Sequence, residues 1–256
     1  MRRALLIAVL TVAALPLAAG TVMELDCHSD SSSPYSFVAR VSIDGPNARF
    51  DVIEGLHPVF NPKITVISRD EGETLIIIDH KQKTYFIRKS RSMSGPISTW
   101  KAPGGTGESN VSFDVDRHVD RHDELETIAG RSVRRYRARA EYDIGMKLEG
   151  EKMSAHVKSE ATFWTIEARN DALPFGLEFA FKSGFDSLDH KVERRLPRIG
   201  IPLKQTVSVT RTIAGGSPIT ERFDATATKV SDEKLDFAIF QAPMGYQFRE
   251  PTFGFE

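Results

Sequence analysis

The sequence predicts a mainly β protein in which one antiparallel sheet curls into an open or closed barrel. Apolar and polar residues alternate with period two in about ten segments. Turns rich in Gly, Pro, Asn and Asp separate most of these segments, and few stretches have the 3.6-residue period of a helix. Two packed sheets would give a similar pattern and are the alternative.

Composition excludes several classes of protein. The chain has 256 residues, of which 40% are hydrophobic and 27% charged, so it can bury a sizeable core and is neither collagen-like nor disordered. Its 34 basic and 35 acidic residues give a net charge of -1. This balance gives no electrostatic reason to expect nucleic acid as a partner.

The N-terminus has the pattern of a secretory signal. A basic end at 1–3 precedes an apolar run at 4–10 and a second apolar stretch, which Pro16 interrupts, and small residues follow at 18–20. We expect a signal peptide over 1–20, cleavage after Gly20, and a single β-rich domain over 21–256 in the periplasm or outside the cell. An uncleaved anchor is the alternative. No second apolar stretch approaches membrane length, so the mature protein is not expected to be integral to a membrane.

Cys27 is the single cysteine, so no internal disulfide can form. The residues just before it, at 24–26, are not the small ones that a lipid-modified N-terminal cysteine requires. We therefore expect no lipid anchor. A half-buried or unpaired thiol near a mobile terminus is expected rather than a nucleophile.

Strands fill the first third of the expected domain. Apolar residues occupy the odd positions of 35–43, and Gly45 opens a turn into the alternating segment 48–52, which predicts a hairpin. The continuous apolar run 75–78 predicts a strand that is covered on both faces. In order, strands are expected at 35–43, 48–52, 63–69, 73–79 and 84–89.

A Gly- and Pro-rich stretch at about 90–110 interrupts the pattern and predicts a loop, lid or linker. Beyond it, 135–142 has the clearest alternation, with apolar Tyr and Ala opposite Arg and Glu. Further strands are expected at 160–168, 203–213 and 219–230. Short helices are expected at 172–182 and 234–240, too few to fill a large barrel, so a partly empty apolar concavity should result.

Aromatic side chains are the candidate lining of this concavity, although ordinary core packing is the alternative for each of them. The candidates border the Gly-rich loop, lie in the later strands, or recur in the expected helix. They are Trp100, Tyr136, Tyr142, Phe163, Trp164, Phe175 and Phe179.

The chain carries no recognisable nucleophile elbow, phosphate loop or zinc-protease motif, and we expect no cofactor. His118 and His122 are the candidate metal ligands. On a helix, residues four apart share a face, so the two imidazoles could bind a metal together with Asp114 or Asp120. The alternatives are a solvated segment with locally paired charges and general acid–base catalysis.

Four arginines at 134, 135, 137 and 139 form a cationic row. We interpret them as the solvent face of a strand, balanced by acidic neighbours. Guanidinium groups also bind phosphate, so anionic head groups are the alternative partner.

A family resemblance adds to this interpretation. The segments that carry it are 65–72, 78–85, 126–131, 163–165, 200–203 and 240–246. They resemble an exported bacterial family of unknown function that is similar to the periplasmic lipoprotein carriers of the LolA and LolB type. The resemblance implies a strongly curved, unclosed half-barrel, with a few helices over the concave face and an apolar cavity that accepts acyl chains. The insert at 90–110 and the histidine segment depart from the family, and no ligand-contacting motif matches.

Three functions follow as hypotheses. The favoured one is a non-catalytic exported binding protein for a lipid, an acyl chain or another hydrophobic small molecule, which fits an apolar concavity. The second is a metal-binding protein or metal-dependent hydrolase that uses His118 and His122. The third is a structural role in the cell envelope.

Overall fold

The computed structural model describes residues 20–30, 34–55, 62–70, 74–89, 112–148, 151–167, 200–213 and 215–250. The first six strands are short: β1 (Gly20–Ser29), β2 (Tyr35–Asp44), β3 (Asn47–Gly55), β4 (Ile64–Arg69), β5 (Thr74–Asp79) and β6 (Thr84–Lys89). The next five are longer: β7 (Ser112–Ile128), β8 (Arg131–Leu148), β9 (Glu151–Ile166), β10 (Ile201–Ile213) and β11 (Ile219–Glu233). A 3-10 helix, η3 (Phe237–Phe240), and the two-residue strand β12 (Gln247–Phe248) follow.

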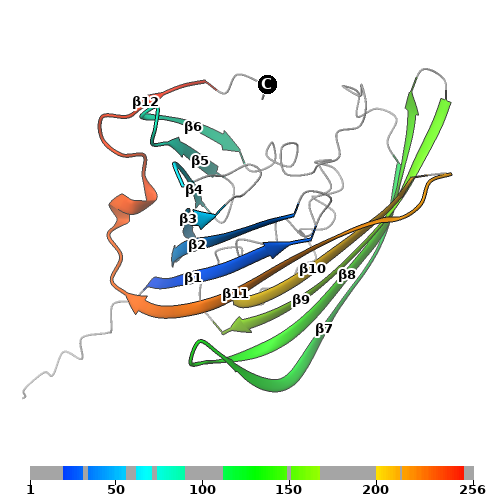
Figure 1. Ribbon diagram of the computed structural model, residues 1–256, viewed down its shortest axis with the longest axis horizontal. Helices are drawn as coiled ribbons and strands as arrows, with labels where there is room; N and C mark the ends of the chain where they lie inside the picture. The colour runs from blue at the N-terminus through cyan, green and yellow to red at the C-terminus, as the bar shows by residue number, and fades with distance from the viewer. Residues whose placement is uncertain are drawn as a thin grey trace, which may run out of the picture.

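These strands form one curved sheet in the order β12-β6-β5-β4-β3-β2-β1-β11-β10-β9-β8-β7. Neighbouring strands are antiparallel except β12 and β6, which run parallel. The edge strands β12 and β7 do not meet, so the sheet is unclosed (Figure 1). The expected single curved antiparallel sheet is confirmed, and the strands described here do not form two packed sheets.

Strand β1 lies at the centre of the sheet and was missing from the sequence prediction. It pairs with β2 on one side and with β11 on the other, so it joins the two halves of the chain. Cys27 lies on β1 and is only 1% exposed. Cys27 is unpaired, as expected, but it is neither half-buried nor near a mobile terminus, because the alternation of Met23, Leu25 and Cys27 belongs to a strand.

The expected strands are confirmed; β8 extends beyond both predicted ends, whereas β9 begins earlier than predicted, at Glu151, and ends at Ile166. Strand β5 is covered on both faces, as its continuous apolar run predicts. Leu75 and Ile77 belong to the large core on the inner face of the sheet, whereas Ile76 and Ile78 pack against Phe240 on the outer face. The outer cover is the segment 234–250, here called the C-terminal strap, which runs along the outside of the sheet (Figure 1).

The expectation that helices cover the concave face is not supported. Within the described ranges the one helix is η3, which has four residues and packs on the outer face. The Asp236 side chain caps it by accepting the Ala238 N–H at 2.9 Å, and the chain is extended again at Gln241, so only part of the helix predicted at 234–240 forms. The predicted helix at 172–182 and the insert at 90–110 lie outside the described residues. No helix in the described portion has the length and apolarity to cross a membrane.

Candidate functional site

Small and apolar side chains form a strip on the inner face of β8, β9 and β10. Successive side chains of a strand point to opposite faces, so every second residue belongs to this surface. We call it the concave strip, and its members are Ala138, Ala140, Tyr142, Ala155, Val157, Ser159, Ala161, Val207 and Val209.

The strand register places these residues in rows that cross the sheet. Ala161 lies between Ala138 and Val207, and Ser159 lies between Ala140 and Val209 in the next row. The alanines and Ser159 are buried. Because Ala and Ser project less far from a sheet than Val, these two rows have short side chains on β8 and β9 and are bordered by the longer valines of β10 on one side.

The two ends of the strip differ. At one end the turn between β7 and β8 folds toward the core, where Val133 is buried and packs in the same cluster as Met23. The Arg131 Nη2 atom lies 2.6 Å from Asp232 Oδ2 of β11, although β9 and β10 separate the two strands in the sheet. This end is therefore closed by the turn.

The other end reaches solvent. Ile213 pairs with Ala155 and is 41% exposed, and Ile219 pairs with Arg211 and is 58% exposed. Both isoleucines lie on the inner face by their register, and so do Arg211 and Glu221, which form an ion pair with each other. The concave strip is thus apolar apart from Ser159 in its buried rows, and the ion pair between Arg211 and Glu221 lies beside the isoleucines of its exposed end.

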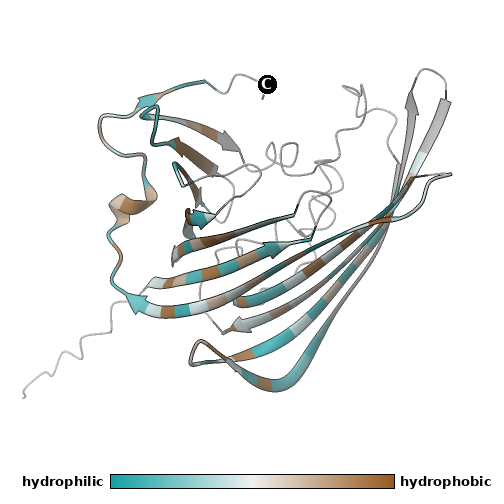
Figure 2. Cartoon of the chain, viewed as in Figure 1, coloured by the Kyte–Doolittle hydropathy of each residue, from teal (hydrophilic) through white to brown (hydrophobic). Residues whose placement is uncertain are grey.

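The reverse face of the same strands is charged. Lys158 Nζ lies 3.2 Å from Glu160 Oε1, and Arg139 Nε lies 3.8 Å from the same oxygen. Arg135 pairs with Glu124 at 3.3 Å and Arg134 pairs with Glu167, so the predicted balance by acidic neighbours is confirmed for Arg134, Arg135 and Arg139. Arg134 alternates with Arg135, however, and lies on the Tyr136 side of β8, so the four arginines do not share one solvent face. Figure 2 shows the resulting alternation of hydrophobic and hydrophilic residues along β10 and β11.

Three of the predicted lining residues share the inner face: Tyr136 lies opposite Phe163, and Tyr142 lies further along β8, opposite Val157. Trp164 follows Phe163 directly in the strand, so its side chain leaves β9 on the opposite side from Phe163, and it packs against the large core that includes Val133 and Leu203. Its neighbours on the adjacent strands are Arg135 and Lys204, whose Nζ atom lies 4.6 Å from the centre of the indole ring. Trp100, Phe175 and Phe179 lie outside the described residues.

The histidine segment is a strand, not the helix on which the metal hypothesis was built. His118 and His122 both belong to β7, where residues four apart are separated by about 13 Å along the backbone. Ligand atoms of one zinc ion lie about 2 Å from the metal, so this spacing does not bring the two rings together by local structure. The side chain of His118 is outside the described set, and within that set no three metal-ligating side chains gather.

Burial raises the pKa of the Cys27 thiol from 9.0 to about 12, and the nearby Asp26 carboxylate adds to the shift. The thiolate is the nucleophilic form of cysteine, so Cys27 is a neutral, unreactive thiol near pH 7. The inner face therefore has no activated sulfur at this position.

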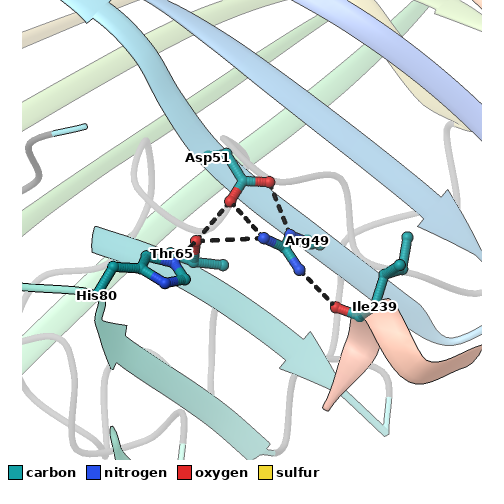
Figure 3. Close-up of polar contacts among 5 residues, drawn as sticks. All are labelled: Arg49, Asp51, Thr65, His80 and Ile239. Carbon is teal, nitrogen blue, oxygen red and sulfur yellow. Dashed lines mark hydrogen bonds and ion pairs between the residues drawn. The ribbon is translucent and has the colours of Figure 1, made fainter. Parts of the chain in front are cut away.

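A polar network on the outer face escaped the sequence analysis. Arg49 lies 2.7 Å and 2.9 Å from the two carboxylate oxygens of Asp51, and it donates a further hydrogen bond of 3.1 Å to the Ile239 carbonyl of the strap (Figure 3). The Arg49-x-Asp51 spacing places both side chains on one face of β3. That spacing was the available signal, but nothing in the sequence identifies the strap as the partner.

The same network continues to Tyr246 of the strap. Thr65 donates its hydroxyl hydrogen to Asp51, so the 2.8 Å contact between Thr65 Oγ1 and His80 Nε2 requires the imidazole to donate. The other ring nitrogen of His80 lies 3.0 Å from Tyr246 Oη. Thr65 is 1% exposed, and through it the network attaches the strap to the sheet.

Comparison with known proteins gives weak likenesses. Neither a family model nor a curated protein matches the chain. A solved structure of an uncharacterized conserved protein from Thermus thermophilus matches with a TM-score of 0.37 and 8% identity, over 92% of each chain. A LolA superfamily protein from Nitrosomonas europaea matches with a TM-score of 0.34 and 10% identity, over 89% of this chain and 91% of that one.

The second of these proteins belongs to the group that the sequence resembles. Likeness at such TM-scores and identities is too weak to support an inference about ligand or activity. The function of this chain must therefore be inferred from its own residues.

Proposed function

We propose that this protein is a non-catalytic exported binding protein that holds a long apolar chain, such as the acyl chain of a lipid, along the concave strip. The observation that carries the proposal is the continuity of short apolar side chains across the inner face of β8, β9 and β10. Sites for apolar ligands are concave surfaces of this composition, with few polar groups.

The two ends of the strip support a lengthwise mode of binding. A chain that enters beside Ile213 and Ile219 passes the paired Arg211 and Glu221, then meets the apolar rows and stops at the closed end near Val133. The transfer of apolar surface from water favours such a complex by about 25 cal/mol for each Å² that is buried. The reverse face of these rows carries charged side chains, among them Arg139, Lys158 and Glu160, so an apolar ligand finds no comparable surface among them.

Export belongs to the same proposal and rests on the N-terminal sequence. The basic residues at 1–3, the apolar run and the small residues at 18–20 support cleavage after Gly20. The mass of the protein purified from the periplasm tests it, and the expected mature chain begins at Thr21.

Ligand binding is tested by filling the strip. We expect a naturally fluorescent long-chain fatty acid to bind the wild-type protein saturably. Ala161→Phe places a ring among the short side chains and should weaken this binding by about tenfold or more. The ring occupies volume that the acyl chain would fill, and the acyl chain loses its contacts with the strip there. Thr162→Phe is the matched control, because its ring projects from the same strand to the opposite face.

Urea unfolding of both variants separates loss of the site from loss of the fold. If Ala161→Phe unfolds, Ala140→Phe in the neighbouring row takes its place. Absence of saturable binding by the wild-type protein would refute the proposal. Equal weakening by Ala161→Phe and Thr162→Phe would refute the assignment to the inner face.

A further inference from the structure

Gln205 is a polar side chain buried within apolar surroundings at the closed end of the concave strip. It is 5% exposed, and its Oε1 atom has no hydrogen-bond partner among the described residues. Nearly all buried polar atoms in native proteins are hydrogen-bonded, because an acceptor that is buried without a partner loses its hydrogen bonds to water and destabilises the fold. An unpaired Oε1 therefore calls for a donor that the described sheet does not contain.

The immediate neighbours of Gln205 cannot supply this donor from their side chains. Phe163 and Ala225 flank it on the adjacent strands, and Leu203 and Val207 precede and follow it on the inner face of β10. All four side chains are hydrocarbon. A partner for Oε1 must approach from above the inner face.

The position of Gln205 puts it on the course of a ligand in the strip. Its row also contains Tyr136 and Phe163, and the next row contains Ala138, Ala161 and Val207. A chain that lies over Ala161 and continues toward the closed end therefore passes over the Gln205 amide.

We infer that the ligand of the concave strip carries an N–H or O–H group on its apolar chain or head, and that Gln205 Oε1 accepts a hydrogen bond from it. The inference rests on the proposed function and narrows its ligand class. A carbonyl oxygen accepts and does not donate, so it pairs with an amide, an alcohol or an acylglycerol with a free hydroxyl. An ester, an ether or an ionised carboxylate offers no hydrogen in return.

Two probes that differ by one donor test this inference. N-dodecylacetamide has an amide N–H, and N-methyl-N-dodecylacetamide has the same apolar chain with the N–H replaced. Displacement of the fluorescent fatty acid measures the affinity of each probe for the wild-type protein, for Gln205→Met and for Ser208→Ala. Met keeps the length of the Gln side chain without its acceptor, and Ser208 lies on the outer face of the same strand.

We expect the wild-type protein to bind N-dodecylacetamide about fivefold to tenfold more tightly than its N-methyl analogue, as one hydrogen bond would give. Gln205→Met should bind both probes with equal affinity, while Ser208→Ala should keep the wild-type preference. Gln205→Met should also unfold at an equal or higher urea concentration than the wild type, because it removes an unpaired acceptor.

The failures are distinguishable. If the wild-type protein binds both probes equally, or if Gln205→Met keeps the preference, the role of Gln205 is refuted while ligand binding by the strip stands. If Gln205→Met is strongly destabilised, Oε1 has a partner in the free protein and the inference is refuted on that ground. If neither probe displaces the fatty acid and the fatty acid itself does not bind, the proposed function falls and this inference falls with it.

Discussion

The thiol of Cys27 provides a sensitive measure of how well the centre of the sheet excludes water. With 1% of its surface exposed and a pKa raised to about 12 by burial, it should not react with Ellman's reagent at pH 8 in the native protein. In guanidinium chloride the same thiol should react completely. Rapid reaction of the native protein would mean that β1 separates from β2 or β11 under native conditions.

The raised pKa of Cys27 also predicts a dependence of stability on pH. Since the folded thiol stays neutral above pH 9.0 while the unfolded thiol ionises, the free energy of unfolding should fall between pH 9.0 and about 12. The limit is ~1.4 kcal/mol for each pH unit. Urea unfolding of the wild type and of Cys27→Ala over this range isolates the effect, because only the wild type contains the ionising group. Parallel pH profiles would contradict the burial of the thiol.

Alanine substitutions at two glycines distinguish the cost of backbone strain from the cost of steric overlap. Gly55 and Gly215 have φ angles of +88° and +80°, so an alanine at either position is strained by about 1 kcal/mol. A Cβ atom at Gly55 would also overlap the Ser36 carbonyl oxygen and Phe37, whereas one at Gly215 meets nothing within 4 Å. Thermal unfolding should therefore show a loss of about 1 kcal/mol for Gly215→Ala and a clearly larger loss for Gly55→Ala. Equal losses would mean that β2 moves to accommodate the added methyl group.

Residue-level alternation predicted part of the candidate site and missed the rest for a physical reason. Period two correctly placed Tyr136 and Tyr142 on one face of a strand. It could not place Gln205 beside Phe163, because cross-strand register depends on turns and bulges that the alternation does not encode, such as the bulge between Pro202 and Lys204.

At the scale of elements, the C-terminal strap is held by polar contacts in addition to apolar packing. Arg49 connects Asp51 to the Ile239 carbonyl, and His80 connects Thr65 to Tyr246. Arg49→Ala should release the strap, because it removes the bond to Ile239 and leaves the Asp51 carboxylate without its cation. Hydrogen exchange of the amides in 237–249 should become faster by about tenfold, as the loss of a charged hydrogen bond implies.

Arg222→Ala is the matched control for the strap. Arg222 pairs with Asp224 at the same two-residue spacing on the outer face, with a hydrogen bond of 2.8 Å, but it lies on β11. This variant should leave exchange in the strap unchanged. If both variants accelerate exchange equally, the effect is a general loss of stability rather than release of the strap.

The sequence prediction was incomplete at β7 and at the segment around η3, which lie at the margins of the sheet, whereas β1, which was also missed, lies at its centre. The charged residues of β7 alternate with few apolar ones, since β7 is an edge strand, and its pattern resembled a solvated helix or loop. The segment around η3 has apolar residues at helical spacing because they pack one side of a short extended strap, where Asp236 and Gln241 limit the helix to four residues. Local pattern identifies buried faces well and identifies edges poorly.

At the scale of the whole molecule, β1 determines whether the protein unfolds as one unit. Only two strand pairs of the described sheet join the strands before the insert to those after it. One is β1 with β11, and the other is the short parallel pair β6 and β12. The inner core crosses this junction without interruption, from Leu75 on β5 to Ala225 on β11. A continuous core predicts a single cooperative transition.

A substitution far from a reporter tests this cooperativity. In a Trp100→Phe background, the remaining indole, Trp164, reports on β9. Ile78→Val removes one buried methylene from β5 and should cost about 1 kcal/mol. If the sheet unfolds as a unit, the urea midpoint of Trp164 fluorescence should fall by the same free energy, although several strands separate the two residues. Ile53→Val, at an exposed position of β3, should leave the midpoint unchanged. If Ile78→Val leaves the urea midpoint of Trp164 fluorescence unchanged, β1 joins two halves that fold independently. Binding along the strip would then depend only on the half that follows the insert.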